Sequence, residues 1–258
     1  MRTGVVTHAC FLKGASMRLD KILSSQGTAS RKDVKKIIKK GRVCVDGAEA
    51  KDPAMQVDPE KSVIIIDGER LDYSRHVYYM MNKPQGVLSA SRDRKRETVV
   101  SLLPEEWQRD GLFPAGRLDA DTTGFVLITD DGELSHRILS PKNHVWKTYL
   151  VSLEHPFTER ERELIEGGMT LSDGTVCMPA HTRQVPGREC QVYLAICEGK
   201  YHQVKRMFET LGNSVTALKR VSIGGVKLDE TLKPGESRAL TATEVAQIEE
   251  NKDFLLFF

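Results

Sequence analysis

The sequence is short of the features that mark several large protein classes. No uncharged apolar run approaches the ~20 residues that a membrane-spanning helix needs, so we expect no association with a membrane. The five cysteines are widely spaced and include no Cys-x-x-Cys pair, which argues against a disulfide framework and a zinc site. Free thiols suit a reducing compartment, and we expect a cytoplasmic protein. The 38 basic and 36 acidic residues nearly cancel, so a nucleic-acid signal must come from where the charges lie.

The length and the change in pattern along the chain indicate two domains. A chain of 258 residues fits one or two domains, and 29% charged residues exclude a fibrous or collagen-like protein. Residues 1–16 lack the clean apolar core of a signal peptide and are expected to be a disordered extension. Residues 17–75 read as a small compact unit that ends in a polar linker around 69–76, and residues 76–258 form the larger second domain.

The small unit combines two helices with short strands. Helical spacing of apolar residues begins at Leu19, and Val34, Ile37 and Ile38 share one face of a second helix that ends near Gly41. Residues 43–45 and 63–66 read as strands, each followed by an Asp-Gly turn.

The second helix carries charge of one sign. Residues 31–42 hold seven basic residues and one acidic residue, a net of +6, mostly on the side away from the apolar face. The basic residues are Arg31, Lys32, Lys35, Lys36, Lys39, Lys40 and Arg42. A solvated helix face usually mixes both signs, so we favour binding to a phosphate backbone over that alternative.

This unit resembles the S4 RNA-binding domain. The motifs that carry the resemblance are Arg18-Leu19-Asp20-Lys21, Ser30-Arg31 and Gly41-Arg42-Val43-x-Val45-Asp46-Gly47. The resemblance covers about 55 residues and implies a module that binds structured RNA. It identifies a class of substrate and leaves the reaction open.

The second domain reads as α+β. Strands are expected at 77–81, 125–129, 147–151 and 191–196, and helices near 132–139, 158–166, 202–211 and 242–250. Strands and helices do not alternate strictly, so a mixed or antiparallel central sheet is favoured over a doubly wound parallel one.

A polar loop bounded by glycines, residues 116–124, is the strongest candidate for chemistry. It places Arg117 beside two carboxylates, Asp119 and Asp121, directly before a buried strand. An aspartate is ionised at neutral pH and can act as a base or a nucleophile. From composition alone, an equal alternative is that Asp119 and Thr122 hydrogen-bond the backbone of the loop.

Two further clusters are less specific by themselves. Residues 198–207 follow a strand and begin a helix whose first turn is basic. Such a helix start can bind an anion, and the alternative is a capped surface helix without a ligand. Residues 82–86, Asn-Lys-Pro-Gln-Gly, follow another strand and would otherwise be only a turn.

Taken together, these segments resemble the pseudouridine synthases that modify ribosomal RNA and carry an N-terminal S4 domain. The matching motifs are Lys83-Pro84-x-Gly86, Gly116-Arg117-Leu118-Asp119-x-x-Thr122-x-Gly124, Lys147-Thr148-Tyr149 and Glu198-Gly199-x-x-His202-Gln203-Val204-Lys205-Arg206-Met207. The resemblance spans residues 17–249. Details of the motifs, including Lys205, are most similar to the branch that acts on 16S rRNA, although the 23S branch shares all four motifs.

The resemblance implies a site and a reaction. The reaction is a cofactor-free isomerisation of uridine in which the N1–C1′ bond breaks and C5 bonds to C1′, so no metal or nucleotide site is expected. Asp119 would be the catalytic carboxylate, Tyr149 would stack on the uracil, and Lys205 would pair with Asp119. The residues assigned to RNA are Arg31, Lys32, Lys35, Lys36, Lys39, Arg42, Lys83, Arg117, His202, Gln203 and Arg206.

The implied partner is ribosomal RNA, expected to be 16S RNA in a small-subunit assembly intermediate, and the implied oligomeric state is a monomer. Two other classes of function stay open at this point. A non-catalytic ribosome-assembly factor would keep the fold as an RNA clamp, and a glycoside hydrolase would need a second catalytic carboxylate besides Asp119.

Overall fold

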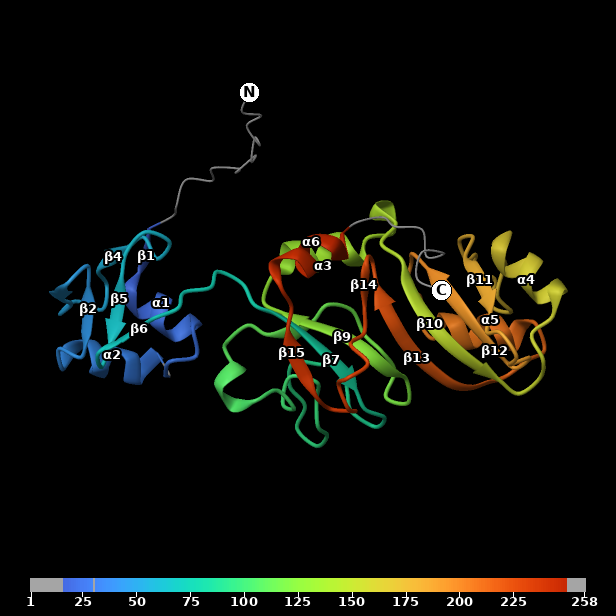
Figure 1. The fold of residues 1–258 in the computed structure, drawn as a ribbon, viewed down its shortest axis with the longest axis horizontal. Helices are drawn as coiled ribbons and strands as arrows, with labels where there is room; N and C mark the ends of the chain where they lie inside the picture. The colour runs from blue at the N-terminus through green and yellow to red at the C-terminus, as the bar shows by residue number, and fades with distance from the viewer. Residues whose placement is uncertain (1–15, 30, 250–258) are drawn as a thin grey trace, which may run out of the picture. The chain divides into compact units, whose positions relative to one another are not determined.

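The computed structural model describes residues 16–29 and 31–249, without the side chain of Arg31. The chain divides into two compact units, residues 1–75 and 76–258 (Figure 1). The expected disordered extension lies outside the described residues apart from Ser16, and so does Ser30 of the S4 motif. No helix within the described ranges is both long enough and apolar enough to span a bilayer.

The first unit packs two helices against short strands. It contains β1 (Met17–Arg18), α1 (Leu19–Ser25), α2 (Arg31–Lys39), β2 (Val43–Val45), β3 (Ala48–Glu49), β4 (Gln56–Val57), β5 (Ile64–Ile66) and β6 (Glu69–Arg70). The sheet order is β3-β2-β5-β6, and β1 pairs with β4. Leu19, Ile22, Val34 and Ile38 are fully buried and form the core between the helices and the sheet. Because β6 pairs with β5, the first two residues of the expected linker belong to this sheet.

The second unit is built on one long mixed sheet. Its strands in spatial order are β11 (His181–Gln184), β12 (Gln191–Ile196), β10 (Lys147–Leu153), β13 (Val215–Ile223), β9 (Thr123–Thr129), β7 (Tyr78–Lys83) and β15 (Ser237–Ala239). β14 (Val226–Lys227) pairs with β13, and β8 (Phe113–Pro114) pairs with β9. β9 and β13 run parallel and the other described pairs run antiparallel, which confirms the expected mixed α+β sheet.

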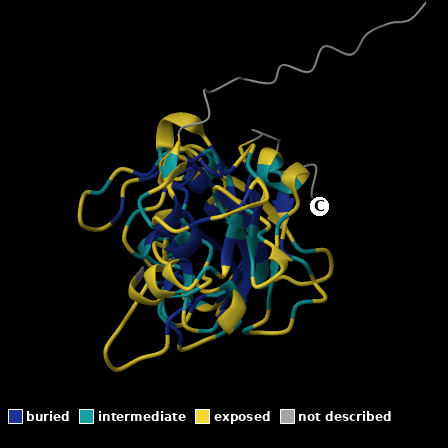
Figure 2. Cartoon of the chain, turned by 90° about the vertical axis from the view of Figure 1, so that its left-hand side faces the viewer, coloured by how far each residue is buried: buried dark blue, intermediate teal, exposed yellow. Residues whose placement is uncertain are grey.

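Helices cover both faces of this sheet. Phe125 and Leu127 of β9 pack on one face with α3 (Gly132–Leu139) and α6 (Ala242–Ile248), while Val126 and Ile128 face the side that carries α4 (Glu159–Glu166) and α5 (Gln203–Thr210). Two short 3-10 turns, η1 (Glu105–Trp107) and η2 (Pro141–Asn143), lie in the connections. Figure 2 shows buried residues along the strands and exposed residues on the loops. Alternation along β9 therefore produces two cores, one on each face.

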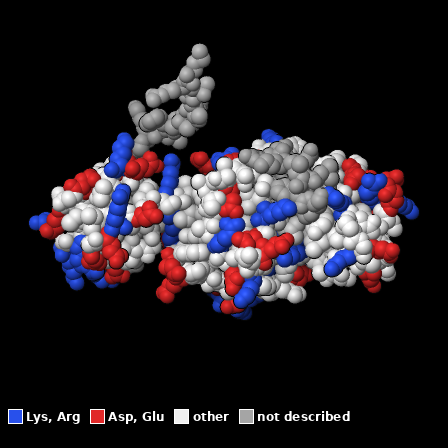
Figure 3. Space-filling model, viewed as in Figure 1, with Lys and Arg blue, Asp and Glu red and all other residues white. Residues whose placement is uncertain are grey.

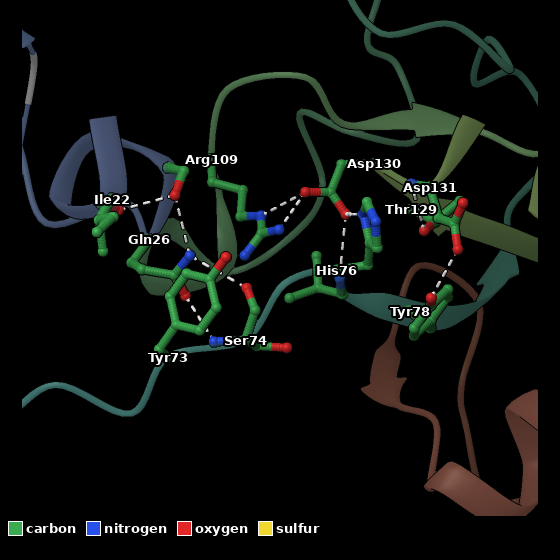
Figure 4. A network of polar contacts seen from close by, with 12 residues as sticks. Ile22, Gln26, Tyr73, Ser74, His76, Tyr78, Arg109, Thr129, Asp130 and Asp131 are labelled. Carbon is green, nitrogen blue, oxygen red and sulfur yellow. Dashed lines mark hydrogen bonds and ion pairs between the residues drawn. The ribbon is translucent and has the colours of Figure 1, made fainter. Parts of the chain in front are cut away.

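A polar network fixes the start of β7 to the end of β9 (Figure 4). Asp130 accepts hydrogen bonds from the Val77 backbone N–H at 3.0 Å and from Arg109 Nε at 2.9 Å, and it lies 3.3 Å from His76 Nδ1. The Tyr78 hydroxyl donates to Asp131 at 2.8 Å, and burial together with this bond raises the pKa of Tyr78.

In the first unit, the same figure shows Gln26 and Ser74 bonded to each other.

β13 is the longest strand of the sheet, and the sequence pattern did not reveal it. Its sequence, Val-Thr-Ala-Leu-Lys-Arg-Val-Ser-Ile, places two cations in the middle of the strand. Lys219 is exposed, but Arg220 is only 3% exposed. A buried arginine breaks the apolar alternation by which a strand is recognised.

The parallel contact between β9 and β13 requires glycine at position 124. Gly124 lies opposite Arg220 and has a φ of +97°. A Cβ atom there would lie 2.2 Å from the Arg220 carbonyl oxygen and 2.9 Å from the Arg220 nitrogen. The two strands therefore approach each other more closely than any side chain allows.

We predict that Gly124→Ala destabilises the second unit far more than Gly235→Ala. Gly235 also has a positive φ, of +92°, but no atom of the described residues lies within 4 Å of the point where a Cβ atom would stand, so only backbone strain of about 1 kcal/mol is expected. Gly124→Ala adds the collision with β13 and should lower the free energy of unfolding by about 3 kcal/mol or more.

Urea denaturation followed by tryptophan fluorescence measures this difference, because both tryptophans, Trp107 and Trp146, lie in the second unit. Equal losses for the two variants would contradict the close-contact explanation.

Candidate active site

The loop before β9 is held from beneath by a buried lysine. Lys83, at the end of β7, donates from Nζ to the carbonyl oxygens of Pro84, Ala120 and Thr122 at 3.0, 3.2 and 2.8 Å. Its side chain is 0% exposed, and burial lowers its pKa to about 8. The assignment of Lys83 to RNA contact is therefore wrong, because its ammonium group is enclosed by the loop that it supports.

A serine fixes the same loop from the other side. Ser89 Oγ accepts a hydrogen bond from the Leu118 N–H at 3.1 Å and donates to the Leu118 carbonyl at 3.0 Å. Sequence reasoning missed Ser89, and nothing in its local sequence distinguishes it. With Leu118 buried and bonded in this way, the neighbouring residues Arg117 and Asp119 are left accessible.

The side chain of Asp119 faces two cationic or polar groups from α5 and its N-terminus. Oδ2 lies 3.3 Å from Lys205 Nζ, and Oδ1 lies 3.4 Å from His202 Nε2. The backbone oxygen of Asp119 accepts the Thr122 N–H, so the turn is made by the main chain and not by the carboxylate. The geometry therefore favours a functional carboxylate over one that only caps its loop.

Lys205 contacts both carboxylates of the loop, and its shorter contacts are to Asp121. Nζ lies 2.6 and 2.8 Å from the two oxygens of Asp121. The hydrogen bond from Lys205 lowers the pKa of Asp121. Burial lowers the pKa of Lys205, but the hydrogen bonds to Asp121 and Asp119 outweigh it and raise that pKa overall. Lys205, which the resemblance pairs with Asp119 alone, is therefore shared with Asp121.

The start of α5 arranges the remaining residues of its motif. His202 has a φ of +47°, and its ring stacks on Tyr201 with ring centroids 3.8 Å apart. Gln203 is 3% exposed and bonds Glu198 Oε1 and the Lys200 N–H. Both ends of its amide therefore already serve the protein, and its assignment to RNA contact stays a prediction. Arg206 is half-buried and pairs with Asp173.

Tyr149 and Asp119 line one cavity of about 950 Å³. Arg117, Ser89, Lys147, His202 and Arg220 also contribute to its walls. A smaller recess of about 90 Å³ adjoins it and brings Lys205 and Thr122 together with Asp119 and Tyr149. The volume is within the range of pockets that enclose a small ligand such as one nucleoside.

The basic residues that the sequence assigned to RNA in the first unit lie on α2 and just after it, and Figure 3 shows Lys and Arg gathered over this helix. Lys32, Lys35 and Lys39 are exposed. Lys36 pairs with Asp33 at 2.9 Å, and Arg42 pairs with Asp67. Arg31 begins α2, and its side chain is not described. The S4-like unit therefore presents four exposed lysines of the predicted set and the exposed Arg42, and Lys36 and Arg42 already have a carboxylate partner.

The described residues offer no obvious metal centre. Within 16–29 and 31–249, no three His, Cys, Asp or Glu side chains converge in a way that could hold a metal ion. The polar groups that line the cavity are instead carboxylates, amines, an imidazole and guanidinium groups, carried by the loop before β9, the start of α5 and the strands β10 and β13.

Comparisons with known proteins agree with this arrangement. Residues 17–63 match the S4 domain, and residues 77–210 match the RNA pseudouridylate synthase family. A protein of Bacillus subtilis (strain 168) named uncharacterized RNA pseudouridine synthase YtzG is 48% identical over 236 residues, 91% of this chain and 99% of that protein.

Two further similarities extend over the same length. Ribosomal small subunit pseudouridine synthase A of Escherichia coli (strain K12) is 44% identical over 236 residues, 90% of this chain and 100% of that protein. A crystal structure of a pseudouridylate synthase superposes with a TM-score of 0.62 at 40% identity, covering 90% of this chain and 100% of that chain. The chain, an S4 domain followed by the catalytic fold, therefore belongs to the RNA pseudouridylate synthase family of isomerases.

Proposed function

We propose that this protein converts one uridine of 16S ribosomal RNA to pseudouridine, at a site of the U516 type. The observation that carries the chemistry is the carboxylate of Asp119, held between Lys205 and His202 at the wall of a cavity that also contains Tyr149. Similarity to small-subunit enzymes over nine-tenths of the chain supports the choice of 16S RNA.

The cavity requires the target nucleotide to leave its helix. The sugar carbon C1′ of a stacked nucleotide is out of reach, so the base must be flipped out at an expense of a few kcal/mol. Tyr149 is 9% exposed on the strand that forms the cavity wall, where its ring can lie against an inserted uracil. Asp119 then acts at the sugar, oriented by Lys205 and His202, while the base is re-attached through C5.

The surface and the chain as a whole support the proposed substrate and setting. The exposed lysines of α2 suit binding to the phosphate backbone, and Arg117 lies beside the cavity where flanking nucleotides would pass. We further propose that the protein acts as a monomer. Free Cys44, Cys177, Cys190 and Cys197 suit the cytoplasm, where small-subunit assembly intermediates supply the RNA.

We predict that Asp119→Asn abolishes isomerisation and leaves RNA binding within about two-fold of the parent. The amide keeps the size of the side chain but removes the charge and the nucleophilic oxygen pair. Asp121→Asn is the matched control, since it neutralises the other carboxylate of the same loop and frees Lys205 for Asp119. Tritium release from [5-³H]uridine-labelled 16S RNA measures activity, and filter binding measures affinity.

An active Asp119→Asn variant would remove the catalytic assignment. An inactive parent that still binds RNA would instead support a non-catalytic assembly factor.

The choice of RNA is tested by mapping pseudouridine on both ribosomal RNAs from cells with and without this protein. We expect a single 16S position to lose the modification when the protein is absent and to regain it on complementation with the parent but not with Asp119→Asn. Loss of a modification in 23S RNA would assign the enzyme to the other branch and leave the chemistry intact.

The role of α2 predicts a change in salt dependence. Replacing Lys32 and Lys35 by Gln should make the slope of log affinity against log salt less steep by about 1 to 2. Each phosphate contact that is lost reduces the size of this slope by somewhat less than 1. The matched control replaces Lys51 and Lys61, which are 81% and 78% exposed elsewhere on the same unit. A similar change of slope for both pairs would show that α2 has no special part in binding.

A further inference from the structure

The floor of the cavity is formed by three side chains of two paired strands. Lys147 and Tyr149 are two residues apart on β10 and therefore lie on one face of the sheet. Arg220 of β13 is the direct cross-strand partner of Tyr149, after an irregularity in the register between Thr148 and Tyr149. Directly opposed residues share a face, and all three line the same cavity.

The two cations of this floor are buried. Arg220 is 3% exposed and Lys147 is 4% exposed. Arg220 donates from Nε to the Phe125 carbonyl at 2.7 Å, and its Nη2 atom is buried with no hydrogen-bond partner among the described residues. Lys147 donates to the Ile138 carbonyl at 2.8 Å and reaches the Cys197 carbonyl at 3.4 Å. The two N–H groups of Nη2 are therefore unused.

The carboxylates of the cavity do not compensate these charges. Within the part of the chain that the structure describes, neither Lys147 nor Arg220 forms an ion pair. The two acids of the cavity are engaged elsewhere, Asp119 with Lys205 and His202, and Glu198 with Lys200 and Gln203. Burial, followed by repulsion from Arg220, lowers the pKa of Lys147 to about 8, so it remains a cation at neutral pH.

Such an arrangement is costly unless a ligand completes it. A buried donor without a partner loses its hydration without replacement, and a buried unpaired charge loses far more. These donors line a cavity of about 950 Å³ together with Tyr149, so a base that stacks on Tyr149 would lie within reach of them. Arginine offers several donors in a fixed plane, which suits a flat ring with carbonyl oxygens.

We propose that Arg220, assisted by the charge of Lys147, binds the carbonyl oxygens of the flipped uracil and stabilises the negative charge that the base carries while it is detached from the sugar. This inference rests on the proposed function, and it gives to Arg220 a contact with the reacting base.

The charge follows from the electron count of the isomerisation. When the N1–C1′ bond breaks heterolytically, its electron pair stays on the base, and the resulting anion is shared by N1, O2 and O4. When C5 bonds to C1′, electrons of this anion form the new bond, and the proton lost from C5 is balanced by the proton gained at N1. No outside reactant is needed. A donor fixed at a carbonyl oxygen is most useful in the detached state, when the charge there is greatest.

A phosphodiester fits this floor less well than a base. A phosphate group is tied to the chain on both sides and strongly hydrated, so it is held most easily near the surface. Cationic groups for that purpose lie at the accessible parts of the cavity, where Arg117 is accessible and Lys200 is one-third exposed. Arg220 and Lys147 lie deeper, level with Tyr149, which is the part of the cavity that only the inserted base is expected to reach.

The test compares Arg220→Gln and Arg220→Lys with the control Lys219→Gln, which removes the same charge from the adjacent, exposed position of β13. Single-turnover rates at saturating enzyme are measured on 16S RNA together with filter-binding affinities, and fluorescence-monitored melting checks that each variant is folded. We expect Arg220→Gln to slow the single-turnover rate about 100-fold or more while affinity changes less than about three-fold, since most affinity comes from phosphates.

Arg220→Lys should have a higher single-turnover rate than Arg220→Gln. Guanidinium ion at low millimolar concentration should restore part of the rate of a folded Arg220→Ala variant, but it should not restore the rate of Asp119→Asn. Lys219→Gln should match the parent. An unchanged single-turnover rate for folded Arg220→Gln would overturn the proposal. If that variant keeps the saturated rate but binds RNA more than about ten-fold more weakly, the proposal also fails, and Arg220 is identified as part of a phosphate site. A parent that forms no pseudouridine would refute the proposed function first.

Discussion

The parallel contact of β9 with β13 is the constraint on which the catalytic unit depends. It joins β7, β9 and β15 to the strands β10, β11, β12 and β13 through a register that pairs Lys219 with Thr123 and Arg220 with Gly124. The absent side chain of Gly124 allows the approach, and Arg220 reaches across to the Phe125 carbonyl. The loop that carries Asp119 ends at this contact, so the geometry of the site is set by how closely two strands meet.

Charge is distributed in the site so that, among the described residues, each acid of the cavity has a partner and two buried cations have no carboxylate. Asp119 and Asp121 share Lys205, His202 approaches Asp119 from the other oxygen, and Glu198 is held by Lys200 and Gln203. Lys147 and Arg220 remain as excess positive charge beside Tyr149. This excess of positive charge is what the proposed stabilisation of a negatively charged base requires.

Binding and chemistry are divided between the two units. The S4-like unit contributes exposed lysines on a rigid helix, which can follow a phosphate chain with little regard for sequence. The second unit contributes the cavity in which we propose that one nucleotide is bound. The side chains that line it come from strands, from the start of α5 and from a loop held by Lys83 and Ser89. Rigid support suits a reaction that must hold a detached base and a sugar in one place while the base turns.

The sequence by itself determined the domain types, the mixed sheet, most helices and the loop that carries Asp119, because these depend on local periodicity and on motifs of contiguous residues. It did not determine which members of those motifs are buried. Lys83 and Gln203 turn inward to satisfy backbone and carboxylate groups, and no local pattern distinguishes them from exposed residues. β13 and the burial of Arg220 were decided only by tertiary structure, since a cation buried in mid-strand is tolerated where a partner strand and a cavity surround it.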